Sequence, residues 1–357
     1  MIGAIIRQIC INDRILTIAM TSTELDFSLQ DLSDYLVAEV AGFQPITTIQ
    51  KFSVGQSNPT YKLSTSAGDF VLRRQPFGEL LKSAHQVDRE FRVMSSLPAT
   101  PLPEMVHLCR DPEIIGSMFF VMSFIDGEQH IDPSFPSVKL ELRKSYYHNA
   151  IDALAQIHSA DLQATNLTDY GKGVNFFARQ IGLWTKQYEL SFTEVRPNMD
   201  HLAEWLPANL PEDDGTVTLI HGDYKFDNML FAKSSPEIAA ILDWELSTLG
   251  HPISDLAYFC MGLRLPKLEF MFGLADVDRH AQGLPSEAEL VERYCEQRKI
   301  PAIDNWHFYL AFSFFRLASI SQGVFYRSTQ GNASSEHAVH AGKMTDILAQ
   351  MGAQLTR

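Results

Sequence analysis

Short apolar runs with strand-like spacing dominate the first 125 residues of the chain. They predict five strands, at residues 46–54, 60–65, 70–74, 104–109 and 118–124. Residues 66–69 (Ser-Ala-Gly-Asp) have the composition of a hairpin turn between the second and third of these strands. Helical periodicity appears at residues 29–40 and again at 79–96. This part of the chain is therefore predicted to be a small antiparallel sheet with an inserted helix.

Helical patterns dominate after Gly127. We expect helices at residues 137–159, two between 176 and 208, and others at 286–298, 306–321 and 336–351. A compact group of strands, at 217–220, 229–231 and 238–242, interrupts them. The predicted fold class is α+β with two lobes, and a cleft between lobes is a common place for a small-molecule site. We divide the chain into a disordered N-terminal extension (1–27), a small lobe (28–125) and a larger, mainly helical lobe (126–357).

The composition excludes several classes of protein. Hydrophobic residues make up 45% of the 357 positions and charged residues 20%, which is globular rather than fibrous or disordered. With 29 Lys and Arg against 43 Asp and Glu, the net charge is −14, which argues against nucleic acid as a partner. No apolar run approaches the roughly 18 residues of a membrane-spanning helix. We expect no membrane partner, and a monomer or homodimer.

The cysteines and the N-terminus bear on the compartment. Four cysteines lie far apart without a CxxC pair, which favours buried reduced thiols over disulfides or a zinc site. The first 20 residues resemble a signal peptide only weakly, because Arg7, Asp13 and Arg14 interrupt the apolar stretch. The expected location is the cytoplasm.

The densest chemical signal lies between residues 221 and 243. If the runs 229–231 and 238–242 pair as a hairpin across 233–237, Asn228 faces Asp243 at the open end of the ladder. Asp223 lies in the loop that precedes this hairpin. Mg²⁺ prefers such oxygen ligands and completes its shell with water and substrate phosphates. The sequence therefore predicts a magnesium site at this end of the hairpin.

The same spacing matches the parts needed for phosphoryl transfer, which depends on positioning and charge neutralisation. In this interpretation Asp223 orients an acceptor hydroxyl, and Lys225 contacts an oxygen of the transferred phosphate. Asn228 and Asp243 hold the metal. Asp and Asn also favour turns for structural reasons, but here the spacing, the flanking strands and the later Asp agree. His221 is expected to brace the loop rather than to titrate.

The order of motifs resembles one known family. HGDYKFDN (221–228), ILDWE (241–245) and GHPISDLAYF (250–259) are similar to the aminoglycoside phosphotransferases, a family that includes choline-kinase-like enzymes and has a protein-kinase-like fold. The resemblance covers about residues 30 to 345 and implies an ATP- and Mg²⁺-dependent kinase. It makes Asp223 the catalytic residue, Asn228 and Asp243 the metal ligands, and Asp255 a brace of the catalytic loop. His158 falls on the helix before this region, where packing explains it.

The resemblance also assigns residues of the small lobe to the nucleotide. Arg73 would contact the α- and β-phosphates with Glu90 as its helix partner, and backbone groups of Ser123 and Ile125 would meet adenine. The sequence departs from the family at Arg73, where many relatives have Lys, but the guanidinium keeps the charge and favours bidentate phosphate contact. The phosphate-covering loop offers only Gly55 and Asn58 in Gly-Gln-Ser-Asn instead of GxGxxG.

Two further departures concern the segment after the second strand of the hairpin. Asp243-Trp244-Glu245 replaces the DFG of protein kinases, and we expect Glu245 to lie beside the metal or on the surface. No stretch resembles a phosphorylatable activation loop, so a protein substrate is not expected. The acceptor is therefore predicted to be a small molecule with a hydroxyl group.

The sequences of three segments (57–61, 71–76 and 243–250) are similar to those of a particular branch of this family, the kinase domains that are fused to acyl-CoA dehydrogenases or work beside them. That branch is associated with hydroxyacyl-CoA substrates, which ranks a hydroxyacyl thioester or similar metabolite above an aminoglycoside. Two other functions stay open from the residues alone. One is a nucleotide-binding pseudokinase or regulatory module. The other is a metal-dependent hydrolase that uses His221, Asp223 and Asp243.

Overall fold

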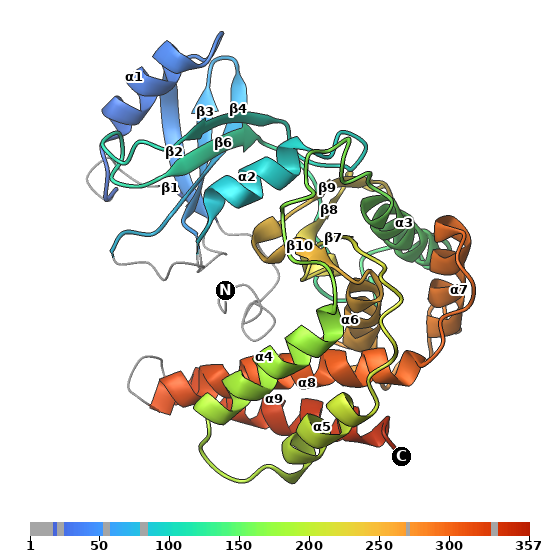
Figure 1. Cartoon of the computed structure of the whole chain (residues 1–357). Helices are drawn as coiled ribbons and strands as arrows, with labels where there is room; N and C mark the ends of the chain where they lie inside the picture. The colour runs from blue at the N-terminus through green and yellow to red at the C-terminus, as the bar shows by residue number, and fades with distance from the viewer. Residues whose placement is uncertain (1–16, 20–24, 53–57, 79–84, 269–271, 330–334) are drawn as a thin grey trace.

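The small lobe is built on a six-stranded antiparallel sheet with the order β1-β2-β3-β4-β6-β5 (Figure 1). The computed structural model describes residues 17–19, 25–52, 58–78, 85–268, 272–329 and 335–357. The strands are β1 (Thr17–Ala19), β2 (Ile46–Phe52), β3 (Thr60–Thr65), β4 (Gly68–Arg74), β5 (Met105–Cys109) and β6 (Phe119–Ser123). The five predicted strands are confirmed. β1 pairs with β2 although it lies in the segment expected to be a disordered extension.

The central strands β4 and β6 are buried on both faces of the sheet, because neighbouring residues of a strand point to opposite sides. Leu72 of β4 and Val121 of β6 pack in one cluster with α1 (Leu29–Glu39), whose Ser28 caps it by accepting from the N–H of Asp31. Val71, Phe120 and Met122, their neighbours in sequence, pack in the other cluster with α2 (Val87–Ser95) and the large lobe. The sheet is thus held between a surface helix and the rest of the protein.

The second helix of the small lobe is shorter than its sequence pattern predicts. The expected helix spanned residues 79–96, whereas α2 begins at Val87. His85 has φ +60°, a left-handed conformation that interrupts a right-handed helix. Residues 79–84 lie outside the described part of the chain. The prediction of a helix before Val87 is therefore wrong at least for residues 85 and 86.

Seven helices and two small hairpin-like pairs of strands are described in the large lobe (Figure 1). The helices are α3 (Leu140–His158), α4 (Phe176–Leu190), α5 (Pro197–Ala208), α6 (Ile253–Arg264), α7 (Glu287–Arg298), α8 (Trp306–Arg327) and α9 (Ser335–Gln354). β7 (Thr218–Ile220) pairs with β10 (Thr248–Gly250), and β8 (Met229–Phe231) pairs with β9 (Ile238–Ile241). The apolar pattern does not predict β10, which is only three residues long. Two short 3₁₀ turns, η2 (Phe226–Asn228) and η3 (Trp244–Leu246), follow the loops that carry the predicted site.

The central helix α8 packs against α4, α5, α6 and α9. Its length and apolar composition would suffice for a membrane span, so the expectation that no stretch approaches this length is wrong. However, 78% of its most apolar window is buried inside the protein. Core helices pass the same test of length and composition, and α8 has the burial of one.

The loop between α3 and α4 runs close to β10, and this generates a prediction about stability. A Cβ at Gly171 would lie 2.3 Å from Oγ1 of Thr248 and 2.7 Å from the backbone N of Leu249. We expect Gly171→Ala to lower the unfolding free energy by about 1–3 kcal/mol, because a packed backbone must shift. Gly182→Ala on α4 is the matched control, since a Cβ there meets nothing within 4 Å. It should stabilise by up to about 1 kcal/mol through helix propensity. Urea unfolding measures both, and an unchanged Gly171→Ala protein would contradict the close approach.

Candidate active site

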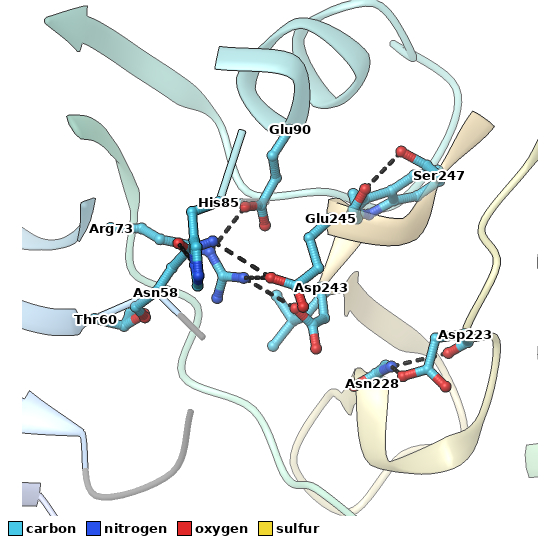
Figure 2. Close-up of polar contacts among 12 residues, drawn as sticks. Asn58, Thr60, Arg73, His85, Glu90, Asp223, Asn228, Asp243, Glu245 and Ser247 are labelled. Atoms are coloured by element: carbon cyan, nitrogen blue, oxygen red, sulfur yellow. Dashed lines mark hydrogen bonds and ion pairs between the residues drawn. The ribbon is translucent and has the colours of Figure 1, made fainter. Parts of the chain in front are cut away.

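A cavity of about 350 Å³ lies between the two lobes. Four predicted nucleotide-binding residues of the small lobe and connector line it, namely Arg73, Glu90, Ser123 and Ile125, together with Asp243 of the large lobe. Asp223 and Asn228 lie beyond Asp243 in the adjoining loop (Figure 2). Gly55, the remaining predicted nucleotide contact apart from Asn58, lies outside the described residues. The sequence predictions therefore converge on one region of the molecule.

Arg73 is the centre of a buried polar cluster that joins the lobes (Figure 2). Its Nε donates to Oε2 of Glu90 at 2.8 Å, as the resemblance implies. Its Nη2 donates to Oδ1 of Asp243 at 3.0 Å and to Oε2 of Glu245 at 3.3 Å. One guanidinium is thus shared by a carboxylate of α2 and two carboxylates of the segment that follows β9.

The charges of this cluster do not balance within it. When all three carboxylates are ionised, the group carries two more negative than positive charges. Burial, reinforced by Asp243 and Glu245 and opposed by Arg73, raises the pKa of Glu90 to about 7. Burial lowers the pKa of Arg73, but the attraction of the three carboxylates outweighs it and the pKa is raised. Such a donor-rich, negatively charged pocket suits a divalent cation.

Asn58 and Glu245 are linked across the cleft. Nδ2 of Asn58 donates to Oε2 of Glu245 at 3.3 Å, and Oδ1 of Asn58 lies 3.0 Å from Nδ1 of His85. The side chain of Glu245 is only 8% exposed, which rules out the surface position that the sequence left open. Glu245 therefore lies beside the predicted metal ligand Asp243, and it also accepts a hydrogen bond from Asn58, which precedes β3.

The catalytic loop takes its shape from a buried carboxylate on α6. Asp255 accepts the backbone N–H groups of His221 at 2.6 Å and Gly222 at 2.9 Å. Gly222 has φ +83°, and a Cβ there would lie 2.5 Å from the carbonyl oxygen of Leu246, so this position requires glycine. Burial raises the pKa of Asp255, but the hydrogen bonds from His158 and from the backbone of His221 help to outweigh it, and the pKa is lowered. The predicted bracing role of Asp255 is confirmed.

His221 uses both ring nitrogens inside the loop. Nδ1 accepts the backbone N–H of Asp223 at 3.2 Å, and Nε2 lies 2.9 Å from the carbonyl oxygen of Leu242, to which it donates. This assigns the neutral imidazole with its proton on Nε2. Because neither nitrogen is left for a metal, the hydrolase interpretation loses one of its three residues, and the bracing role predicted for His221 is confirmed.

The carboxylate of Asp223 is held by three groups. Oδ1 accepts from the hydroxyl of Tyr258 at 2.9 Å, and Oδ2 accepts from Nδ2 of Asn228 at 3.0 Å. Nζ of Lys225 lies 3.3 Å from Oδ2 of Asp223 and 3.8 Å from the carboxylate of Asp227. Burial lowers the pKa of Lys225, but these carboxylates outweigh it and the pKa is raised. Lys225 therefore points at the carboxylate of Asp223, and the catalytic role of Asp223 and the contact of Lys225 with phosphate stay predictions.

The hairpin that carries the predicted metal ligands has a different register from the predicted one. Met229 faces Ile241, and the N–H of Leu242 donates to the carbonyl of Asn228 at 2.8 Å, so Asn228 faces Leu242 instead of Asp243. Phe231 pairs with Ile238 near the turn, and an irregularity between Leu230 and Phe231 moves the rest of the ladder one residue closer to the predicted register. Asp243 follows the strand with φ +67°, a left-handed turn that aims its carboxylate at Arg73.

The oxygen donors nevertheless fit Mg²⁺. Nδ2 of Asn228 donates to the carbonyl and carboxylate of Asp223, which turns the amide oxygen away from that residue. Asn228 and Asp243 then offer one amide oxygen and one carboxylate from adjoining positions of the hairpin. In the described residues no group of three or more His, Cys, Asp and Glu side chains forms a metal cage. Mg²⁺ commonly keeps waters and phosphates in place of such a cage.

Three residues of the site were missed from the sequence. Tyr258 lies on α6 three residues after Asp255, and that spacing on one helix could have suggested it. Nη2 of Arg316 donates to the carbonyl of Gly222 at 2.7 Å, and its guanidinium lies 5.8 Å from the ring of Trp184. Neither Arg316 nor His85 has a local sequence signal, because each meets its partner only through the fold.

His158, expected to pack, also bonds to Asp255 at 3.3 Å and to Tyr294 at 2.6 Å.

Comparison with known proteins gives the same picture. The sequence model of the phosphotransferase enzyme family matches residues 48–292. The chain is 44% identical over 86% of its length to mouse acyl-CoA dehydrogenase family member 10, and 39% identical over 93% to rat acyl-CoA dehydrogenase family member 11. It spans only 29% and 43% of the length of these two relatives.

Solved structures share the fold. A crystal structure from Ralstonia eutropha, provisionally described as an aminoglycoside phosphotransferase, is 40% identical with a TM-score of 0.85, covering 92% of this chain and 98% of that one. The macrolide 2'-phosphotransferase MphH from Brachybacterium faecium is 18% identical with a TM-score of 0.57, covering 89% and 97%. The aminoglycoside phosphotransferase APH(4)-Ia, bound to AMP-PNP and hygromycin B, is 14% identical with a TM-score of 0.57, covering 90% and 98%. The predicted two-lobed, protein-kinase-like α+β fold is confirmed.

The buried His158 predicts how stability depends on pH. Burial lowers its pKa, against the opposing effect of Asp255. Below pH 6.5, roughly the pKa of a histidine in the unfolded chain, the unfolded chain binds a proton at His158 that the folded chain resists. The stability that the neutral His158 contributes to the fold is therefore lost as pH falls from about 7 to 5. We expect His158→Gln to reduce the slope of unfolding free energy over this range by up to about 1.4 kcal/mol per pH unit. Urea unfolding at several pH values measures the slope.

The exposed His201 on α5 supplies the control. His201→Gln should leave the wild-type slope in place. A His158→Gln protein with the wild-type slope would show that His158 titrates alike in both states.

Proposed function

The chain belongs to the phosphotransferase enzyme family, and from this premise we propose that it transfers the γ-phosphoryl group of ATP, with Mg²⁺, to a hydroxyl of a small anionic acceptor. The observation that carries the proposal is the Arg73 cluster. A cation from the small lobe, its partner Glu90 and the carboxylate of Asp243 meet in one interlobe cavity. The pseudokinase alternative is less favoured, because Asp223 and Asn228 complete the set next to it.

The nucleotide would lie in the interlobe cavity. The N–H of Ser123 donates to the carbonyl of Glu104 at 2.8 Å, so its carbonyl, with the backbone of Ile125, is the group offered to adenine. Arg73 would exchange its bonds to Asp243 and Glu245 for phosphate oxygens, which its planar fork suits. Asn228 and Asp243 would hold Mg²⁺, which neutralises charge on the phosphates.

Asp223 would orient the acceptor hydroxyl and accept its proton. Its two oxygens are directed by Tyr258 and Asn228, so little reorganisation is needed when the acceptor arrives. Lys225, whose ammonium lies 3.3 Å from Asp223, would shield the carboxylate from the incoming phosphate charge. The residues thus position the reactants and balance charge, which is the main requirement of phosphoryl transfer.

The acceptor is proposed to be a hydroxyacyl thioester or a similar anionic metabolite. Two observations support it. The curated relatives described above are named acyl-CoA dehydrogenase family members, and this chain matches only part of them. Arg316 places a cation against the catalytic loop, at the carbonyl of Gly222 next to Asp223. That charge would oppose polycations such as hygromycin B, the antibiotic bound in a structural neighbour.

We extend the proposal to a cytoplasmic location. Cys109, Cys260 and Cys295 are free and buried, as expected from the sequence. Free thiols suit a reducing compartment. Fractionation of cells that express the tagged chain would test the location.

The first functional prediction concerns Asp223. We expect Asp223→Asn to lower phosphoryl transfer about a hundredfold or more, because the amide cannot accept the hydroxyl proton. Binding of Mg²⁺·AMP-PNP should stay within about twofold, since Asp223 lies outside the cavity that holds the nucleotide. Asp126→Asn is the control, a cavity-lining carboxylate that is mostly exposed and paired with Lys233. If Asp223→Asn retains turnover, the assignment of Asp223 as the catalytic residue is wrong. If the wild-type chain binds the nucleotide but turns over no acceptor, the pseudokinase is favoured.

The second concerns the acceptor. We expect 3- or 4-hydroxyacyl-CoA to stimulate ATP consumption, and hygromycin B, amino alcohols and sugars to leave it near background. Arg316→Gln should raise the KM for the anionic acceptor about tenfold or more, as for the loss of a charged hydrogen bond, and leave the KM for ATP unchanged. A coupled ADP-release assay measures both. Turnover with the aminoglycoside alone would contradict the charge argument.

A further inference from the structure

The helix that carries Glu90 depends on tertiary contacts for its position. α2 has nine residues, and its N-cap Gln86 makes no side-chain capping bond. Isolated helices of this length are marginal in water. The distance between Glu90 and Arg73 is therefore set by what α2 packs against, and one of its neighbours is η3, which begins one residue after Asp243.

Tyr170 contacts the back of α2 at the residue before Glu90. The guanidinium of Arg89 lies 4.1 Å from the ring centroid of Tyr170 and donates to its backbone carbonyl at 2.7 Å. The hydroxyl of Tyr170 in turn donates to the carbonyl of Arg89 at 3.1 Å. Two hydrogen bonds and a cation–π contact thus join one residue of α2 to one residue of the α3–α4 loop.

The same hydroxyl reaches the metal-binding segment. Oη of Tyr170 lies 2.8 Å from Oγ of Ser247, two residues after Glu245. Each hydroxyl has one proton. Ser247 donates its proton to the carbonyl of Trp244 at 2.5 Å, so the proton of Tyr170 is shared between Oγ of Ser247 and the carbonyl of Arg89. The N–H of Ser247 also donates to the carbonyl of Trp244, at 3.0 Å. A buried relay of two hydroxyls therefore connects the segment of Asp243 and Glu245 with the helix of Glu90.

The base of this relay is rigidly seated in the large lobe. Tyr170 is 1% exposed. Gly171 follows it so close to Thr248 and Leu249 that a Cβ has no room. The ring therefore has a fixed position relative to Ser247.

We propose that Tyr170 is a positioning residue that holds α2, and through it Glu90 and Arg73, in the arrangement that binds nucleotide phosphates. The inference rests on the proposed function, because it gives Arg73 a phosphate to bind. It adds a residue that touches neither nucleotide nor acceptor and acts only through the Arg73–Glu90 pair. Tyr170 lies 80 residues from Glu90 in sequence, in a loop without any motif of the family resemblance.

The experiment measures binding of Mg²⁺·AMP-PNP by calorimetry, which needs no acceptor. Tyr170→Phe keeps the ring over Arg89 and removes the hydroxyl. We expect its Kd to rise about fivefold, the loss of roughly one buried hydrogen bond. In a Glu90→Gln background the same change should have little further effect, because both act through Arg73. A residue that merely stabilises the fold would lower Tm and leave both Kd values in place.

Asp169→Asn is the matched control. Asp169 precedes Tyr170 and pairs with Arg92 of α2 on the surface, where its side chain is 74% exposed, so its loss should change the Kd less than about twofold. Should Tyr170→Phe fail to fold, Ser247→Ala removes the same relay from the other end and should weaken binding likewise. An unchanged Kd in the folded variant, or full additivity with Glu90→Gln, would overturn the inference alone. A wild-type chain that binds no Mg²⁺·AMP-PNP would overturn the proposed function as well.

Discussion

The arrangement of the two lobes depends on one guanidinium shared by three buried carboxylates. Arg73 of β4 reaches Glu90 of α2, and Asp243 and Glu245 of the large lobe, within 2.8–3.3 Å. Burying these charges costs free energy that the single cation does not fully offset, which the raised pKa of Glu90 reflects. A site of this kind is better explained by a bound cation and phosphates than by stability. We propose that this energetic deficit of the protein alone favours the binding of Mg²⁺ and a polyphosphate in the cleft.

The second constraint is the fixed geometry of the loop that carries Asp223. Asp255 holds the N–H groups of two successive residues, Gly222 adopts a conformation that only glycine fits, and Arg316 binds its carbonyl. Two of these contacts come from α6 and α8, so the carboxylate proposed to be catalytic is positioned by the helical core of the large lobe. The groups proposed to bind the nucleotide come instead mainly from the small lobe. Movement of one lobe against the other would therefore change the distance between phosphate and acceptor, and contacts that couple the lobes, such as those of Arg73 and Tyr170, gain importance.

The sequence alone determined much of this protein. Five strands of the small lobe and six helices of the large lobe were predictable, because alternation and helical periodicity report burial, whereas β1 and α6 were not predicted from the pattern. The HGDYKFDN and ILDWE segments were also predictable as a site, because the spacing of Asp223, Asn228 and Asp243 around a local hairpin limits where they can lie. Asp255 and the Arg73–Glu90 pair followed from the order of motifs. Local patterns of this kind are encoded over a few neighbouring residues, so a single sequence contains them.

Only the tertiary structure decided the rest. The register of β8 and β9 differs from the predicted one because Phe231 pairs with Ile238 at the turn, and the irregularity between Leu230 and Phe231 reduces this difference to one residue. The left-handed backbone of Asp243 then directs its carboxylate toward Arg73. The sequence pattern indicates which residues form a hairpin, whereas packing decides where its turn is centred. Arg316 and Tyr170 carry no local signal, since each meets a partner more than 70 residues away. Such contacts depend on how whole elements pack, and that information is spread over the complete chain.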